Sequence, residues 1–393
     1  MGNSWLNEER LSRYPRIFAT LHVAIWGFFM LTGANLMDRT GKPIGSDFLL
    51  FYTASTMALR GETATSYDFT RFYETQRTII PADYPNPWVY PPVFLLFILP
   101  LGLLPYLASF LAWVSTNLAL YLVTLRRIAP HPFTLWIAFG YPGTFQNLMH
   151  GQNGLLIASL MGGGLLLLPQ SPVWAGVLFG LLVIKPHMAV MLVVALVAGR
   201  HWKALTATFL AACLLMLISL AVFGLDPWRA FFGNLELPVQ ILQTESSLWK
   251  KMVTTYSGFR LLGLDHHVAM GFQVVVSLTA MGTLGWIWSH QASHSLKASS
   301  LCIAVLLFTP YGYNYDLGIL GLAIAYSGWE TYREHWSERE KLPLVAAWLL
   351  PLLAPACAMS LRLSIAPFIL LWFLTIVFRR TRMPVAAGKV AAS

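Results

Sequence analysis

The chain has 393 residues, of which 56% are hydrophobic and only 11% are charged. A soluble domain of this size carries about 25% charged residues, so the composition excludes an ordinary soluble protein and predicts an all-α integral membrane protein. The formal net charge of +9 does not indicate nucleic-acid binding, because the lysines and arginines gather at the ends of apolar segments rather than along one face.

Apolar segments long enough, or nearly long enough, to cross a membrane recur along the chain. They cover residues 17–36, 106–125, 133–149, 153–168, 173–184, 187–199, 204–224, 268–289, 298–310, 317–329, 343–361 and 363–379. A further apolar segment, 90–105, is short and contains Pro100 and Pro105.

The distribution of positive charge decides how segment 90–105 is counted. If the N-terminus is cytoplasmic and 90–105 does not cross, the clusters of lysine and arginine all fall on the cytoplasmic side, as the positive-inside rule requires. We therefore predict a single polytopic domain over residues 1–379 with about twelve spans, and a re-entrant or interfacial segment at 90–105. The basic tail, 380–393, and the N-terminus are expected in the cytoplasm.

This topology places two long loops, 37–92 and 225–267, on the outer face. Within the first loop, residues 47–60 and 68–79 are predicted to form amphipathic interfacial helices. Three short polar stretches share that face: MHGQNG (149–154), IKPHM (184–188) and YGYNYD (311–316). The cytoplasmic connections are short and the chain has no glycine-rich phosphate-binding motif, so we expect the chemistry on the outer face without a nucleotide.

Asp47 stands at the start of the segment SDFLLFYTASTMALRG, where the first predicted span ends. Aspartate is common at helix N-caps, so one interpretation of Asp47 is a structural cap. The other interpretation is a functional carboxylate, which its position beside the other outer polar stretches favours. Tyr52, in the helix that follows, is a candidate for contact with a sugar or an acceptor.

Two of the short outer stretches carry further candidates. His150, Gln152 and Asn153 form either a polar turn or a set of hydrogen-bonding groups for sugar hydroxyls, for which amide side chains are suited. Lys185 lies between apolar segments with no acidic residue nearby in sequence. A lysine in the membrane interior costs about 3 kcal/mol, so Lys185 either reaches the surface or binds an anion such as a lipid phosphate, which His187 could join.

The third stretch, TPYGYNYDLG, combines aromatic and amide side chains. Such residues stack on sugar rings or line a lipid groove, and an interfacial aromatic belt has the same composition. The candidates for the sugar or acceptor are Tyr311, Asn314 and Asp316, and Tyr313 and Tyr315 lie between them in the sequence. Loop 225–267, which is rich in aromatic residues and in charges of both signs, is predicted to be an interfacial lid or acceptor surface.

We expect neither a metal ion nor a cofactor. The three cysteines lie inside apolar segments without metal-ligand spacing, and no outer stretch holds more than a single acid, whereas a divalent cation needs several oxygen ligands. The motifs of zinc hydrolases and serine hydrolases are absent from the sequence.

The order of these motifs resembles that of a known family. The segments SDFLLFYTASTMALRG, YDF and YPPVFLLFILPLGLLP, followed by GQNGLLIASLMGGGLLL, AGVLFGLLVIKPHMAVML and TPYGYNYDLGILGL, are similar in sequence and order to glycosyltransferase family 87. The likeness covers roughly residues 15 to 330. This family is typified by mannosyltransferases that depend on polyprenol-phosphate-mannose.

The resemblance implies a GT-C fold in the inner membrane, with an extracytoplasmic active site and a polyprenyl-phosphate-linked sugar as donor. Carried over residue by residue, it makes Asp47 the general base on the acceptor hydroxyl and places Lys185 at the donor phosphate. Many members have a histidine in the late motif, where this chain reads Tyr-Asn-Tyr-Asp, so Tyr315 or His187 would replace it. The hexose, the lipid or glycan acceptor and the oligomeric state stay open.

Two other classes of membrane protein are alternatives. A transporter or flippase of lipid-linked sugars would use charges inside its spans and two repeated halves, and this chain has no internal repeat. A surface-polysaccharide ligase or polymerase would be expected to carry its key arginines and histidines in one late outer loop. Loop 225–267 offers only Arg229, Arg260 and the pair His266–His267.

Overall fold

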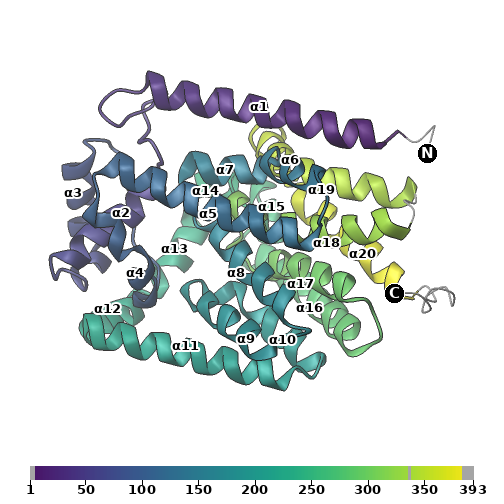
Figure 1. The fold of residues 1–393 in the computed structure, drawn as a ribbon. Coiled ribbons are helices and arrows are strands. Elements are labelled where there is room, and N and C mark those ends of the chain that lie inside the picture. Colours follow the sequence, from purple (N-terminus) through teal and green to yellow (C-terminus); the bar gives the residue numbers. More distant parts are fainter. Residues whose placement is uncertain (1–4, 335–337, 383–393) are drawn as a thin grey trace.

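The computed structural model describes residues 5–334 and 338–382, and these residues form helices joined by short connections without a β-strand (Figure 1). The α-helices of the first half are α1 (Glu8–Thr32), α2 (Phe48–Leu59), α3 (Phe69–Ile79), α4 (Pro92–Ile98), α5 (Tyr106–Ile128), α6 (Phe133–Phe139), α7 (Pro142–His150), α8 (Gly154–Leu167), α9 (Pro172–Gly180) and α10 (Val190–Ala198). Those of the second half are α11 (Trp202–Phe223), α12 (Asp226–Gly233), α13 (Glu236–Thr244), α14 (Ser246–Trp249), α15 (Thr255–Leu261), α16 (His266–Ser289), α17 (His294–Phe308), α18 (Gly318–Glu334), α19 (Glu338–Leu361) and α20 (Ala366–Arg382).

Short 3₁₀ helices complete the path: η1 (Thr65–Tyr67), η2 (Leu99–Leu103), η3 (Leu181–Ile184), η4 (Pro186–Met188) and η5 (Asn314–Leu317). The predicted basic tail 380–393 is helical as far as Arg382, in α20, and its remainder lies outside the described residues.

Five of these helices are long and apolar enough to cross a membrane: α1, α5, α11, α16 and α19. Several other predicted spans are shorter apolar helices, including α8 and α17. The predicted span 133–149 is wrong as a single helix, because it breaks into α6 and α7. Tyr141, between them, has an extended backbone, which is the conformation that the following Pro142 favours.

Segment 90–105 forms α4 and η2, which are short and mostly buried. Helix α4 continues directly into η2, so the two form one apolar helix over Pro92–Leu103, shorter than the about 20 residues of a typical span. Other predicted spans are as short, so the non-crossing position of 90–105 stays a prediction.

The two helices predicted in the first outer loop are present, with α2 and α3 beginning and ending within about one residue of expectation. Helix α3 is amphipathic, with Phe72 and Gln76 buried on one face. The prediction of an amphipathic surface helix is wrong for α2, whose residues Phe48, Phe51 and Ala54 are fully enclosed by the protein. Helix α2 is therefore a wall of the core rather than a surface helix.

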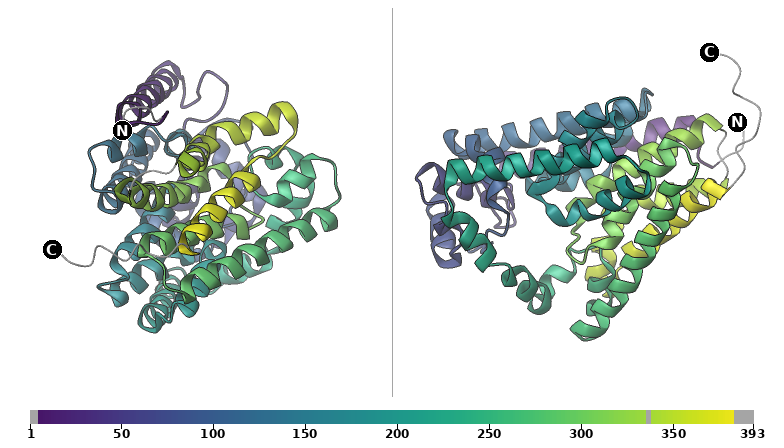
Figure 2. Two further views of the ribbon diagram at one scale, coloured as in Figure 1. Left: turned by 90° about the vertical axis from the view of Figure 1, so that its right-hand side faces the viewer. Right: turned by 90° about the horizontal axis from the view of Figure 1, so that it is seen from below.

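The centre of the molecule is formed by α8, α17 and α18, whose facing residues are almost all buried. Helix α1 runs along the outside of this bundle (Figures 1 and 2) and leaves large apolar side chains uncovered, such as Leu31 at 87% exposure. Exposed leucines also follow α11. Apolar residues on an outer surface are what lipid contact requires.

Helices α2, α3 and α12 gather at the left of the molecule in Figure 1, and the ends of α1 and α20 nearest the termini lie at the right.

Candidate active site

Asp47 precedes α2 but does not cap it. Its backbone is already helical and its carboxylate makes no capping hydrogen bond to α2. Instead, Oδ2 accepts a hydrogen bond of 2.9 Å from Nε2 of Gln152, and the Asp47 backbone N–H donates to the carbonyl of His150 at 3.0 Å. Asp68 shows the contrast, because its carboxylate does cap α3 through Arg71 N at 3.1 Å. The structural-cap interpretation of Asp47 is therefore wrong, and its half-buried carboxylate is held by a side chain distant in sequence.

The turn 151–153, between α7 and α8, brings Gln152 to Asp47. Gly151 adopts a left-handed conformation with φ of +67°, and a Cβ on it would lie 2.5 Å from Cβ of Phe48. Glycine alone allows this approach of the turn to the start of α2. His150, just before the turn, shares a 2.9 Å hydrogen bond between its Nδ1 and Oγ of Ser46.

Gly154 joins the same turn to the late motif. A Cβ at Gly154 would lie 2.3 Å from the carbonyl oxygen of Tyr315, so α8 begins in direct contact with the Tyr315 backbone. That carbonyl also accepts a 2.8 Å hydrogen bond from Nδ2 of Asn147 on α7. The stretches 149–154 and 311–316, separated by more than 150 residues, therefore form one surface.

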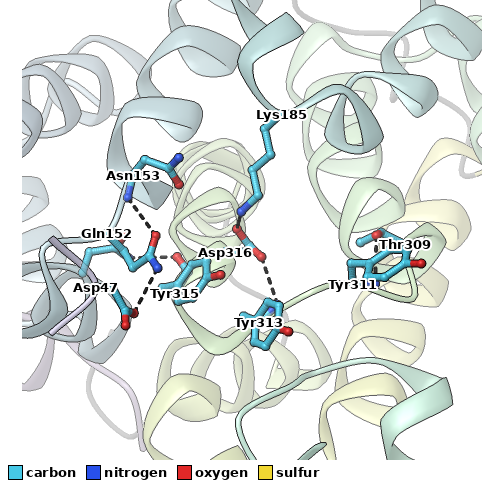
Figure 3. Close-up of polar contacts among 10 residues, drawn as sticks. Asp47, Gln152, Asn153, Lys185, Thr309, Tyr311, Tyr313, Tyr315 and Asp316 are labelled. Atoms are coloured by element: carbon cyan, nitrogen blue, oxygen red, sulfur yellow. Dashed lines mark hydrogen bonds and ion pairs between the residues drawn. The ribbon is translucent and has the colours of Figure 1, made fainter. Parts of the chain in front are cut away.

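Lys185 lies on the other side of this surface, where η3 ends and η4 begins, and forms an ion pair with Oδ1 of Asp316 (Figure 3). Both side chains are buried, with 6% and 1% of their surface exposed. The ammonium also lies 4.9 Å from the centre of the Tyr315 ring, within cation–π range. Lys185 thus meets the partner that the local sequence lacks, and it does not extend to the surface.

The loop that carries Asp316 is fixed from three directions. Oδ2 of Asp316 accepts a 2.9 Å hydrogen bond from the Tyr313 backbone N–H. The backbone of loop 225–267 pairs with it, through Val253 N to Gly312 O at 3.0 Å and Asn314 N to Lys251 O at 2.9 Å.

The third fixing contact comes from α19. Nδ2 of Asn314 donates to the Pro351 carbonyl at 2.9 Å, and Nε2 of Gln146 donates to the same oxygen at 3.1 Å. This carbonyl is free to accept both because Pro355, one turn later, has no N–H to offer it. Nδ2 of Asn314 therefore serves the fold, whereas its Oδ1 is buried without a protein partner among the described residues.

Several buried polar side-chain atoms at the site have no protein hydrogen-bond partner of normal geometry within residues 5–334 and 338–382, among them Oδ1 of Asn147 and of Asn314. Asn153 is fully buried with both amide atoms in this group, and its side chain interacts with the hydroxyl of Tyr90. Nε2 of His187 is likewise buried and unpaired, and its ring centre lies 6.3 Å from that of Tyr311. Unpaired buried polar atoms are costly, so they point to a bound polar group at this place.

Tyr84 and Tyr90, which sequence reasoning missed, also belong to the site or its edge, together with Tyr313 of the predicted stretch 311–316. Burial, followed by the carboxylate of Asp47, raises the pKa of Tyr84. Burial, followed by the carboxylates of Asp316 and Asp47, raises the pKa of Tyr90, and that of Tyr313 for the same reasons. The negative charges of Asp316 and Asp47 therefore both act on the hydroxyl groups of Tyr90 and Tyr313.

Of the residues predicted from the sequence, Figure 3 places Asp47, Gln152, Asn153, Lys185, Tyr311, Tyr315 and Asp316 around one space. Tyr52 points elsewhere, since its hydroxyl donates to the Leu104 carbonyl at 2.9 Å. Tyr84 and Asn147 had no sequence signal beyond being polar or aromatic residues near the predicted outer face, and Tyr90 was noted only as the first residue of the family-like segment 90–105.

The arrangement can bind a proton at one side and hold an anion at the other. Asp47 supplies a half-buried carboxylate, and Lys185 supplies a buried cation. Among the residues that the structure describes, no group of three or more histidine, cysteine or acidic side chains is arranged to hold a metal ion.

Comparison with known families adds the decisive observation. The family model of glycosyltransferase family 87 matches residues 88–310, which is more than half of the chain. The chain belongs to glycosyltransferase family 87. It is a membrane glycosyltransferase, as the resemblance of its motifs implies. The comparisons with curated proteins and with solved structures gave no match.

The matched residues of this family 87 glycosyltransferase include Gln152, Asn153, Lys185 and His187. Asp47 and the stretch 311–316 lie outside them, and it is the fold that brings these two parts to the matched region.

Proposed function

We propose that this glycosyltransferase transfers a hexose from a polyprenyl-phosphate donor to a hydroxyl group of a lipid or glycan acceptor, on the extracytoplasmic face of the inner membrane. The observation that carries the proposal is that one site contains both the carboxylate of Asp47, which does not cap a helix, and the buried ammonium of Lys185.

In the proposed reaction, Asp47 takes the proton of the acceptor hydroxyl. The acceptor oxygen attacks the anomeric carbon and forms the new glycosidic bond, while the bond from that carbon to the phosphate oxygen breaks. The electron pair of the broken bond leaves with the polyprenyl phosphate. Lys185 would stabilise the charge that develops on this phosphate, as preorganised cations do in other transfer reactions. The donor carries its own leaving group, so no nucleotide is required.

Asn153 and His187 would bind the polar part of the donor. Their unpaired buried atoms lie beside Gln152 and Tyr311 respectively, so a sugar hydroxyl or phosphate oxygen would supply the missing hydrogen bonds. Gln152 would hold the Asp47 carboxylate toward the acceptor.

The test is donor turnover by the purified protein in lipid nanodiscs, with a panel of polyprenyl-phosphate sugars and a crude lipid and glycan extract as acceptor. Release of polyprenyl phosphate is measured for the wild type, for Asp47→Asn and for Asp68→Asn. A positioned base typically contributes 10²- to 10⁴-fold, so Asp47→Asn should lose at least about 100-fold. Asp68→Asn removes a carboxylate of the same loop whose role is capping, and it should retain activity.

Equal loss in both variants, or no loss in either, would exclude Asp47 as the base. If no donor is consumed while labelled lipid crosses the bilayer, the transporter alternative replaces the transferase.

A further inference from the structure

A basic pocket lies far from Asp47 in the fold, where the turn between α10 and α11 meets the turn between α16 and α17. Its volume is about 750 Å³, and its walls include Arg200, His290, Lys297, Trp288 and Ser293. In Figure 1 both turns lie toward the end of the molecule that holds the C-terminal end of α20. The topology predicted from the positive charges puts this end in the cytoplasm.

Trp288 packs against both turns that form the pocket. It is 2% exposed, and its Nε1 donates a 2.9 Å hydrogen bond to the Lys297 carbonyl. A Cβ at Gly199 would lie 2.9 Å from this indole, and the ring of His201 meets it edge-on with 5.8 Å between ring centres. The three segments therefore have a fixed arrangement, in contrast to the scattered cations of an ordinary surface.

The charges at this pocket are positive and largely uncompensated. No carboxylate lies within ion-pair distance of Arg200 or Lys297 among the described residues. The acid that contacts a wall residue is Glu330, which accepts hydrogen bonds of 2.8 and 2.6 Å from Oγ of Ser293.

A further cation borders the pocket through Trp286. His290 stacks on the Trp286 ring at 4.1 Å, and the guanidinium of Arg382 lies 5.3 Å from the centre of the same ring. Arg200, His290 and Lys297 thus line the pocket, and Arg382 lies on the neighbouring Trp286 ring, outside the lining.

Arg200 occupies a backbone position that suits glycine better. Its φ is +55°, just after the end of α10, where glycine is the usual residue because a side chain is strained there. An arginine at this position is therefore less favourable for folding than a glycine would be.

Exposed apolar side chains continue along α11 and α16, the two helices with one end each at the pocket. Leu210, Leu214 and Leu217 of α11 are between 58% and 66% exposed, and Val275 and Leu278 of α16 are 62% and 60% exposed. A ligand with a phosphate headgroup and acyl chains would match both the cations and these surfaces. Basic pockets between membrane helices on the cytoplasmic side bind such headgroups.

We propose that this basic pocket binds the phosphate headgroup of an anionic phospholipid, with its acyl chains along the exposed faces of α11 and α16. The site is separate from the one that contains Asp47, and the proposal does not depend on the donor or acceptor of the sugar transfer.

The test compares two matched variants, Arg200→Gly and Arg362→Gly. Arg362 is also exposed and has a φ of +54°, so both substitutions relieve the same backbone strain and remove one positive charge. The apparent affinity for phosphatidylglycerol is measured from the rise in melting temperature of the purified protein as lipid is added. Phosphatidylcholine and inorganic phosphate are tested in parallel.

Each cation near an anionic lipid contributes about fivefold in affinity, so Arg200→Gly should weaken phosphatidylglycerol binding about fivefold, and addition of Lys297→Gln should bring the loss to about 30-fold. Arg362→Gly should bind as the wild type does. Both glycine variants should be at least as heat-stable as the wild type without added lipid, so reduced binding would not reflect unfolding. Equal responses of the two variants, or equal stabilisation by phosphatidylcholine, would overturn the proposal. Equal protection by inorganic phosphate would overturn the assignment to a lipid.

Discussion

The ion pair of Lys185 and Asp316 allows the sharpest prediction, because both side chains are almost completely enclosed. Replacing Lys185 with Met leaves the Asp316 carboxylate buried without its cation, and replacing Asp316 with Asn leaves the ammonium without its anion. Asn keeps an oxygen that can accept the hydrogen bond from the Tyr313 backbone, so the change concerns charge rather than the loop.

The expected cost of each single substitution is large. Breaking a buried pair by removing one partner costs about 3–5 kcal/mol of unfolding free energy, whereas removing both charges together is often neutral. The double variant Lys185→Met with Asp316→Asn should therefore be more stable than either single variant. The deviation from additivity should be at least about 2 kcal/mol.

Unfolding free energies are measured by SDS titration in mixed micelles, with Arg71→Ala as the control. Arg71 and Glu74 form an exposed pair at 3.4 Å, with 69% and 59% of their side chains accessible, and should contribute less than about 1 kcal/mol. If the single substitutions at Lys185 and Asp316 cost no more than this control, the argument from burial is refuted. A stable double variant that has lost donor turnover would assign the Lys185–Asp316 pair to the reaction as well as to the fold.

Two further predictions concern the fold around the site. Gly154→Ala should destabilise the protein by about 2 kcal/mol or more, because the added Cβ would lie 2.3 Å from the Tyr315 carbonyl oxygen. The control is Gly282→Ala in α16, where a Cβ meets nothing within 4 Å, and this variant should be neutral or stabilising. Equal melting temperatures of the two variants would contradict the close contact at Gly154. Hydrogen bonds from the backbone N–H groups of Val268 and His267 lower the pKa of Asp265 in the folded protein. The stability that this cap provides is therefore complete above about pH 3.9, the pKa of an unfolded aspartate. It is lost as the pH falls through the lower pKa of the folded state. Asp265→Asn should remove that part of the pH dependence of thermal unfolding, and an unchanged dependence would mean that Asp265 does not contribute to it.

Sequence reasoning succeeded where local chemistry sets the structure. The bounds of α3 follow from the cap at Asp68, and the ends of α5, α11 and α16 follow from the length of their apolar segments. It failed at 133–149, where Pro142 divides an apolar segment that looks continuous, and at α2, whose burial depends on neighbours that composition does not reveal.

The site was predictable as a set of polar stretches but not as a geometry. The family resemblance names Asp47 and Lys185, and the structure brings both to one space (Figure 3). The pairing of Lys185 with Asp316, across 131 residues, could not be read from the chain, because helix order along the sequence does not give the order of helices in space. Tyr84 and Tyr90 lie in an irregular part of the first loop, where no periodicity marks them.

The backbone pairing between loop 225–267 and the late motif has a mechanical consequence. Val253 and Lys251 are linked by main-chain hydrogen bonds to Gly312 and Asn314, one turn before the acid that holds Lys185. A displacement of the loop that keeps these bonds intact must carry the motif with it and pull on the buried ion pair. An acceptor that pushes this loop aside would therefore act on the cation at the far side of the site, without touching it.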